Sequence, residues 1–582
     1  MNSPAFGALD SFAEKPSSKT RIAVSRTIAS ELVRVLAGAG VTHAFGLIGG
    51  AIAPLAHALN ESAIELIHFR HETGAAFAAI EAYFASGRPA VVFATTGPGL
   101  ANVVTGMAAA RWEGAKVVLI SPATSPANRG RRAFQETHAF DVQGLTPGGP
   151  LFDYTAVIDD PAALATVGPA LARGLARPGP FIAHVQLSIA AQMAQAPAAS
   201  RPIAYESASL ACPPAMLDRV VDQLVGRSFV LWVGAGAARC ADPIRRFVEA
   251  TGAPVMSTPR GKGIFPEGHP SYLGVTGLGG HAAVDEYLAA HRPDTIVVLG
   301  SRLGEMTSFW DRRLLPRERL IHVDIDETAF GGAYPEAATT AVVSDAGELL
   351  DGLLRHARGR LASRAHAPLG SPFGAPPDPR AGGPVRARVL MAALQRVLDT
   401  RGELPVLAEA GNSFAWTTHT LRFSRPLHRV STGFGSMGHA ACGVVGAALA
   451  TSGKAIAVVG DGAMLMNSEV STAVEHRVPA VWIVLNDSQY GMIDQGMRSV
   501  GLAPFATRIP RADFAWIARA VGARGLRVRS ELELDAALTE AMNASGPCVV
   551  DVDVATDEDA PTRKRNSSLL DQGIAQRTGD EA

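Results

Sequence analysis

Short, almost wholly apolar segments rich in β-branched residues recur along the chain and alternate with longer amphipathic stretches. The runs AVVFATT (90–96), TIVVLGS (295–301) and AVWIVLND (480–487) have no alternating polar face, which is typical of strands covered on both sides. Amphipathic helices between such strands provide the crossover connections that parallel sheets require. The sequence therefore predicts an α/β fold in which three doubly wound parallel-sheet domains follow one another.

Two segments of different composition divide the chain, one near residues 190–214 and one near 358–384. Both are rich in Ala, Pro, Gly and Ser and lack a sustained apolar period, so they can bury little surface and are predicted to be linkers. We predict a flexible N-terminal extension at residues 1–21, three domains at 22–190, 213–357 and 385–560, and a polar C-terminal tail at 561–582.

The charge balance argues against a polyanionic partner. The 582 residues include 53 basic and 54 acidic side chains, which give no net field that would attract nucleic acid or an anionic membrane. No apolar run approaches the roughly 20 residues that span a bilayer, and the polar N-terminus lacks the apolar core of a signal peptide. Four dispersed cysteines form no metal-binding spacing and suit a reducing compartment. We expect a cytoplasmic protein with neither nucleic-acid nor membrane partners.

A glycine-flanked aspartate ends one predicted strand of the third domain. Asp461 lies between Gly460 and Gly462, and a helix leads from it to a second strand that ends at Asp487. Ligands of parallel sheets bind at the carboxyl ends of the strands, and glycine lets the backbone approach a diphosphate closely. Mg²⁺ prefers oxygen ligands and usually binds beside phosphates. We therefore predict a magnesium–diphosphate site with Asp461, Asp487 and the carbonyl of Gln489 as metal ligands.

This strand–helix–strand element resembles the motif that binds thiamine diphosphate (ThDP) in the diphosphate-binding domain of ThDP enzymes. In that family the second strand usually ends on Asn, whereas this chain has Asp487, which adds negative charge beside an anionic cofactor. Residues 431–438 resemble the segment whose Met holds the two cofactor rings in a bent arrangement, a role that falls to Met437. The resemblance assigns cofactor contacts to Gly435, Met437, Gly460, Asp461, Gly462, Ala463, Asp487, Tyr490, Gly491 and Met492.

The first domain contains motifs that complement this one. Glu72, preceded by Arg-His, and the segment 96–99 with Asn102 resemble the pyrimidine-binding domain of the same superfamily. That resemblance implies that Glu72 binds N1′ of the aminopyrimidine, where a shared proton favours the imino tautomer that activates the coenzyme. It also assigns cofactor contacts to Pro98 and Asn102. The alternative is that Glu72 is an exposed carboxylate at the start of a helix.

The loop at 130–136 resembles the acetolactate synthase loop that contains Phe-Gln-Glu. This resemblance makes Gln135 a catalytic candidate that helps to activate the donor, and Phe134 a wall of the catalytic pocket. The central domain has glycine-rich loops at 233–240 and 261–270, and the corresponding domain of acetolactate synthases holds a non-redox FAD. The likeness is partial here. We expect a structural spacer without FAD and keep bound FAD as the less favoured alternative.

Three departures from the housekeeping acetolactate synthases fall near the expected substrate pocket. Gly496 stands where a Trp shapes the acceptor site, Ile48 stands where Pro is usual, and Phe152 puts an aromatic ring in place of a cation. These departures favour a specialised carboligase that accepts a larger or more apolar substrate. The predicted pocket residues are Ile48, Gly49, Phe134, Gln135, Ile493 and Gly496.

The resemblance covers nearly the whole chain and implies both a reaction and an assembly. We expect an enzyme that uses ThDP and Mg²⁺ to decarboxylate a 2-oxo acid and add the remaining fragment to a second carbonyl. We also expect a homodimer or homotetramer with active sites at the subunit interface. One alternative is a 2-oxo acid decarboxylase that releases aldehyde, although the paired His of pyruvate-decarboxylase-like enzymes is not evident. Another is a catalytically silent homologue that acts as a partner subunit, which Asp487 favours.

Overall fold

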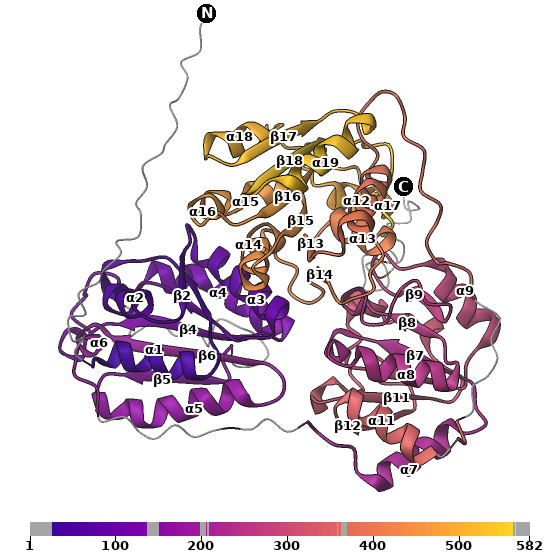
Figure 1. Cartoon of the computed structure of the whole chain (residues 1–582), viewed down its shortest axis with the longest axis horizontal. Helices are drawn as coiled ribbons and strands as arrows, with labels where there is room; N and C mark the ends of the chain where they lie inside the picture. Colours follow the sequence, from indigo (N-terminus) through magenta and orange to yellow (C-terminus); the bar gives the residue numbers. More distant parts are fainter. Residues whose placement is uncertain are drawn as a thin grey trace, which may run out of the picture.

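The computed structural model contains three domains, each built around a six-stranded parallel sheet with helices on its faces (Figure 1). The predicted α/β fold of three doubly wound domains is confirmed. The residues that the structure describes are 26–136, 151–197, 205, 209–357, 359–361, 369–466, 468–562, 565 and 568. The predicted N-terminal extension lies outside them, as does nearly all of the predicted C-terminal tail.

The N-terminal sheet has the strand order β2-β1-β3-β4-β6-β5. The strand order reverses between the neighbouring strands β1 and β3, because the chain continues from β1 to one side of the sheet and from β3 to the other. Parallel α/β sheets bind their ligands at such a point. The strands are β1 (His43–Gly46), β2 (Glu65–His68), β3 (Ala90–Phe93), β4 (Lys116–Ala123), β5 (Tyr154–Ile158) and β6 (Phe181–Ser188). The helices are α1 (Ile28–Gly38), α2 (Ala53–Asn60), α3 (Glu72–Ser86), α4 (Pro98–Glu113), α5 (Leu164–Ala176) and α6 (Ile189–Gln192).

The central sheet has the order β12-β11-β10-β7-β8-β9 and its own buried core. Its strands are β7 (Phe229–Val233), β8 (Val255–Ser257), β9 (Tyr272–Val275), β10 (Thr295–Leu299), β11 (Arg319–Asp324) and β12 (Thr339–Val343). Its helices are α7 (Pro214–Leu224), α8 (Ala241–Thr251), α9 (Ala282–His291), α10 (Glu305–Ser308) and α11 (Ala346–Ala357).

The C-terminal sheet has the order β14-β13-β15-β16-β18-β17. Its strands are β13 (Val406–Ala408), β14 (His428–Val430), β15 (Ala455–Gly460), β16 (Ala480–Asn486), β17 (Arg524–Val528) and β18 (Cys548–Asp553). Its helices are α12 (Ala387–Arg401), α13 (Asn412–Thr420), α14 (His439–Thr451), α15 (Asp461–Met466), α16 (Val470–Glu475), α17 (Gly491–Ser499), α18 (Phe514–Ala520) and α19 (Leu534–Asn543).

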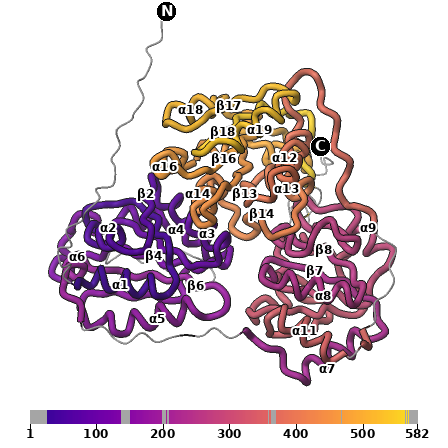
Figure 2. The backbone as a smooth tube through the Cα atoms, viewed as in Figure 1, coloured from indigo at the N-terminus to yellow at the C-terminus, as the bar shows by residue number. Residues whose placement is uncertain are grey.

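Helices α3 and α14 join the N-terminal and C-terminal domains, and Figure 2 shows them side by side at the junction. Both are built mainly from small residues, and a Cβ added to Gly446 would collide with the carbonyl oxygen of Ala78. At the same contact, Glu81 pairs with Arg429 and with His439 at 2.9 Å. Burial disfavours the charge of Glu81, but these two partners hold its pKa well below the usual range.

A second buried ion pair ties the central domain to α4. The carboxylate of Glu113 lies 2.9 Å from Nη1 of Arg260 and accepts a hydrogen bond from Ser431 of the C-terminal domain. One buried carboxylate therefore contacts both other domains. Within the described residues, no helix is long and apolar enough to cross a membrane. All four cysteines are buried free thiols.

Candidate active site

Asp461 lies where β15 ends, beside the end of the neighbouring strand β16. Its Oδ1 accepts a hydrogen bond from the backbone N–H of Gly462, and its Oδ2 accepts one from Ser488, both at 2.7 Å. The carboxylate therefore bridges the loops that follow two adjacent parallel strands. Burial and the charge of Asp487 raise the pKa of Asp461 to about 7. A cation between the two aspartates would relieve this repulsion.

Unpaired oxygen atoms gather around the two aspartates. Nε2 of Gln489 donates to Oδ2 of Asp487 at 3.2 Å, while Oε1 of Gln489 is buried with no hydrogen-bond partner. Oδ1 of Asn412 is also buried without a partner. No group of three or more His, Cys, Asp or Glu side chains within the described part could hold a metal ion. Two carboxylates with amide oxygens nonetheless fit Mg²⁺, which takes its remaining ligands from phosphate and water.

Asn412 is a candidate ligand that the sequence analysis missed. Asn412 begins α13. A Cβ added to Gly491 would lie 2.8 Å from Nδ2 of Asn412 and 3.1 Å from Oδ2 of Asp487, so both side chains lie against Gly491. Asn412 follows β13, a third parallel strand of the same sheet. The pattern Gly411-Asn412 after an apolar run was the available signal, but β13 has only three residues and does not stand out in the sequence.

The glycines predicted to contact the cofactor differ in their surroundings: two lie on open backbone and one packs against a side chain. A Cβ added to Gly460 or Gly435 would meet no atom within 4 Å, so the backbone at these positions is open to a ligand. Gly435 has a φ of +64°, which glycine adopts readily. A Cβ added to Gly462 would instead press against the ring of Tyr490. Open backbone near Asp461 fits the close approach of a diphosphate.

Three further predicted contacts lie on α15, on α17 and in the segment before α14. Met437 is half-buried in the segment between β14 and α14. Met492, at the start of α17, packs on a small apolar cluster that includes Phe414 of α13. Ala463 is buried in α15. The contacts of these three residues with a cofactor remain predictions.

Glu72 is the first residue of α3 and is only 3% exposed, which excludes an exposed carboxylate at the helix start. Its Oε2 accepts a hydrogen bond from Nδ2 of Asn102 at 3.1 Å. Its Oε1 would lie 3.1 Å from a Cβ added to Gly99, next to Pro98 at the start of α4. A buried carboxylate with one amide partner fits a group that shares a proton with a bound ring.

Two of the residues predicted to face the substrate, Gly49 and Gln135, lie against the turn that follows β3. Thr96 donates a hydrogen bond from Oγ1 to Oε1 of Gln135 at 3.2 Å, and Gln135 has a left-handed φ of +56°. A Cβ added to Gly49 would press against Thr95, which also lies against Gly99. Gly49, Gln135 and Glu72 are therefore linked through one short turn.

Several other predicted pocket residues are open to solvent. Phe134 is 91% exposed and Ile48 is also exposed, so neither forms a closed wall within this chain. Ile493 is 49% exposed on α17, a helix with no buried residue, and Gly496 lies one turn further along it. No hydrogen bond or ion pair among the described residues joins Glu72 to Asp461 or Asp487.

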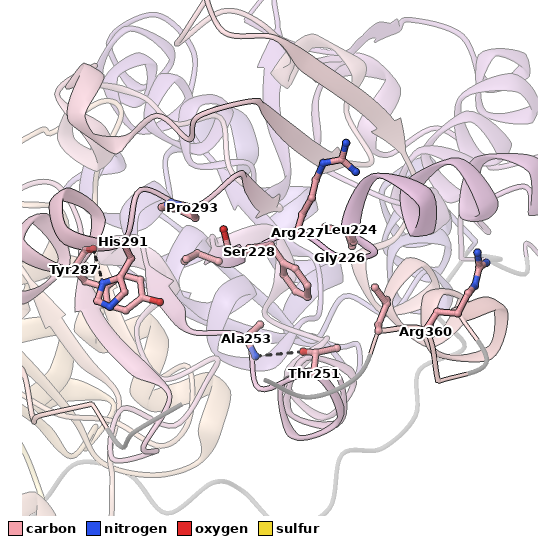
Figure 3. Close-up of a pocket in the computed structure, with 13 residues that line it drawn as sticks. Leu224, Gly226, Arg227, Ser228, Thr251, Ala253, Tyr287, His291, Pro293 and Arg360 are labelled. Carbon is pink, nitrogen blue, oxygen red and sulfur yellow. Dashed lines mark hydrogen bonds between the residues drawn. The ribbon is translucent and has the colours of Figure 1, made fainter. Parts of the chain in front are cut away.

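The central domain has glycines at the corresponding strand ends, but they pack against each other. The N–H of Gly236 donates to the carbonyl of Gly300 at 2.9 Å, and a Cβ on Gly236 would touch Gly300. Close packing of the two loops accounts for these glycines without a nucleotide. A pocket at the opposite end of β7, lined in part by Leu224, Ser228 and His291, lies away from these strand ends (Figure 3).

Comparison with known proteins agrees with this arrangement. Three domains of the thiamine pyrophosphate enzymes match this chain: the N-terminal TPP binding domain at residues 26–144, the central domain at 220–353 and the C-terminal TPP binding domain at 409–552. Acetolactate synthase 2 of Zea mays is 30% identical, with 90% of this chain and 85% of the relative covered. Acetolactate synthase 1 of Oryza sativa subsp. japonica is 31% identical (90% and 84%). The isozyme 1 large subunit of Escherichia coli is 27% identical (91% and 94%). The chain therefore belongs to the thiamine-diphosphate enzyme family and is a relative of the acetolactate synthases.

Proposed function

We propose that this protein is a Mg²⁺- and ThDP-dependent carboligase, which decarboxylates a 2-oxo acid and joins the remaining acyl fragment to a second carbonyl. The observation that supports this most strongly is the pair Asp461 and Asp487, which follow the ends of the adjacent strands β15 and β16 and whose pKa values are both raised, in Asp461 partly by the charge of Asp487. The names of the relatives, which are acetolactate synthases, support the carboligase class. The oxygen atoms around Asp461 and Asp487 provide a set of ligands that suits Mg²⁺.

Each group of residues would have its own task. Asp461, Asp487, Asn412 and Gln489 would hold Mg²⁺ through oxygen atoms, with the diphosphate over the open backbone at Gly460. Glu72 would hold a proton at N1′ of the aminopyrimidine, and Asn102 keeps its carboxylate oriented. ThDP, when bound, supplies an electron sink for the charge that decarboxylation leaves. Burial keeps bulk water away from the carboxylate of Glu72.

The substrate specificity would depend on the exposed residues near β3 and on α17. Gln135 would orient the donor, and its hydrogen bond to Thr96 fixes its position. Gly496 has no side chain on α17, one turn after Ile493, which supports an acceptor or donor larger than those of a housekeeping acetolactate synthase. The catalytic unit would be a homodimer or homotetramer, because Phe134, Ile493 and Phe505 present apolar surface that a second copy would cover.

Product analysis tests this proposal. The protein with Mg²⁺ and ThDP would be offered a panel of 2-oxo acids, each with aldehyde and ketone acceptors, and the products identified by mass spectrometry. We expect ligated hydroxy-ketone or hydroxy-acid products. Free aldehyde as the only product would favour the decarboxylase alternative, and the lack of both turnover and ThDP binding would favour a silent partner subunit. Acetolactate formation from pyruvate alone, as efficient as that of a housekeeping enzyme, would refute the specialised substrate.

A further inference from the structure

The short segment that leads into Glu72 is bonded to the C-terminal domain of the same chain. The backbone N–H of Arg70 donates to Oε2 of Glu469 at 3.1 Å, and that of His71 donates to Oε1 of Glu469 at 3.0 Å. The N–H of His68, the last residue of β2, donates to Nε2 of His476 at 3.3 Å. Three backbone amides from the end of β2 to the residue before α3 thus have acceptors about 400 residues further along the chain.

Glu469 has features that suit this contact. Both of its carboxylate oxygens accept a backbone N–H, and the side chain is buried. Its φ of +50° is rare for a residue with a long side chain and costs free energy. Oγ1 of Thr472 donates a further hydrogen bond to Oε2. Local strain and a buried charge persist only where surrounding contacts compensate for them.

A later turn of α3 is held by the same domain. Glu81, which follows Glu72 by two and a half turns, binds Arg429 and His439. A helix transmits a shift at one end to the other because its turns are hydrogen-bonded in series. The carboxylate of Glu72 therefore takes its position from two contacts with the C-terminal domain, one just before α3 and one near its middle.

We propose that Glu469 is a positioning residue for Glu72. By accepting the amides of Arg70 and His71, it fixes the start of α3 so that the Glu72 carboxylate meets the aminopyrimidine at hydrogen-bonding distance. Displacement of a reacting group by about 1 Å can slow a reaction about 100-fold. This inference rests on the proposed role of Glu72 in coenzyme activation.

The test compares Glu469→Gln with a matched control, Glu475→Gln. Gln at 469 keeps the size of the side chain but leaves one backbone N–H without an acceptor. Glu475 makes an exposed ion pair with the side chain of Arg70 in the same contact, and exposed pairs contribute little. Three quantities would be measured: deuterium exchange of the amides at 68–72 without cofactor, deuterium exchange at C2 of bound ThDP, and affinity for Mg²⁺-ThDP.

For Glu469→Gln we expect faster amide exchange at 68–72, C2 exchange slowed about 10- to 100-fold, and cofactor affinity within about twofold of the unmodified protein. Glu475→Gln should change none of the three. Unchanged amide exchange, or unchanged C2 exchange, in Glu469→Gln would refute the inference. If Glu469→Gln fails to fold, Glu469→Asp replaces it, because Asp tolerates a left-handed φ. For Glu469→Asp we expect C2 exchange to be slowed, but less than in Glu469→Gln. If Glu72→Gln leaves C2 exchange unchanged, the proposed function itself fails.

Discussion

At the scale of single residues, the pair Asp461 and Asp487 determines how the protein would bind its metal. Each aspartate lies at the end of a buried strand, and burial raises the pKa of both. The effect is larger at Asp461, where the charge of Asp487 adds to burial and the pKa reaches about 7. If Mg²⁺ binds here as proposed, a proton would compete with it for the carboxylate of Asp461 near neutral pH.

The first prediction concerns pH. A carboxylate whose folded pKa is raised stabilises the fold at low pH and loses this contribution as pH rises through about 7. The metal-free protein should therefore melt at a lower temperature at about pH 8 than at about pH 6. Mg²⁺-ThDP should raise the melting temperature more at the higher pH. Calorimetric scans with and without Mg²⁺-ThDP measure both effects, and equal increments at the two pH values would contradict the assignment.

A second prediction uses Asp487→Asn, which restores the amide usual in the family. Without the neighbouring charge, the pKa of Asp461 should fall and Mg²⁺ binding should persist to lower pH. Titration calorimetry from about pH 5.5 to 8 would show the shift. Asp494→Asn on α17 is the control, because it also removes one carboxylate but leaves the pair intact. An unchanged pH profile in Asp487→Asn would mean that the two aspartates do not interact.

A third prediction concerns Glu72→Gln. A neutral amide of the same size cannot take up the proton at N1′, so turnover should fall by at least about 100-fold, the effect typical of general acid–base groups. Binding of Mg²⁺-ThDP should change little, since the diphosphate contacts lie in another domain. Initial rates and calorimetry on the same preparation test this. Activity close to that of the unmodified protein would exclude the assigned role.

At the scale of secondary structure, the sequence predicts elements that have a strong local signal. β16 is a continuous apolar run and β15 leads directly into the glycine-flanked Asp461, so both strands and the aspartates that follow them are readable from the sequence. β13 and β14 have three residues each, too few to show a period, and Asn412 was missed with them. Contacts such as that of Glu469 with the amide of His71 join residues 398 apart and have no local signal.

A fourth prediction addresses the packing of α3 on α14. Gly446→Ala places a methyl group against the carbonyl oxygen of Ala78, and neither helix can retreat without breaking the Glu81 ion pairs. Overpacking of this kind costs about 1–3 kcal/mol of unfolding free energy. Urea unfolding measures the loss. Gly453→Ala is the control, because its added Cβ comes no closer than 3.6 Å to any neighbour, and equal effects of the two changes would argue against tight packing.

At the scale of the whole molecule, buried ion pairs connect the three domains. Glu113 of α4 pairs with Arg260 of the central domain, and burial lowers the pKa of that guanidinium to about 10 although Glu113 opposes the shift. Burial also opposes the charge of Glu113, but Arg260 and other nearby cations hold its pKa below the usual range. The pair therefore stabilises the assembly of domains at neutral pH and loses this effect in acid.

The fifth prediction removes one or both members of that pair. Glu113→Gln leaves the guanidinium of Arg260 buried without a counter-charge and should cost about 3–5 kcal/mol of unfolding free energy. The double variant with Arg260→Met should recover most of this loss, because no charge then remains unpaired. Urea unfolding of the single and double variants measures the difference. Equal stability of the two variants would show that the cost is not electrostatic.

The interlocked small residues of α3 and α14 also limit how the gene could be recombined with those of related enzymes. A chimaera that imports a foreign N-terminal domain must bring its counterpart of α3 equally close to Gly443 and Gly446, where the side chain of Glu81 and the carbonyl oxygen of Ala78 leave no room for even a methyl group. Crossovers that keep both helices from one parent should yield folded chains, whereas crossovers between them should be selected against in a library.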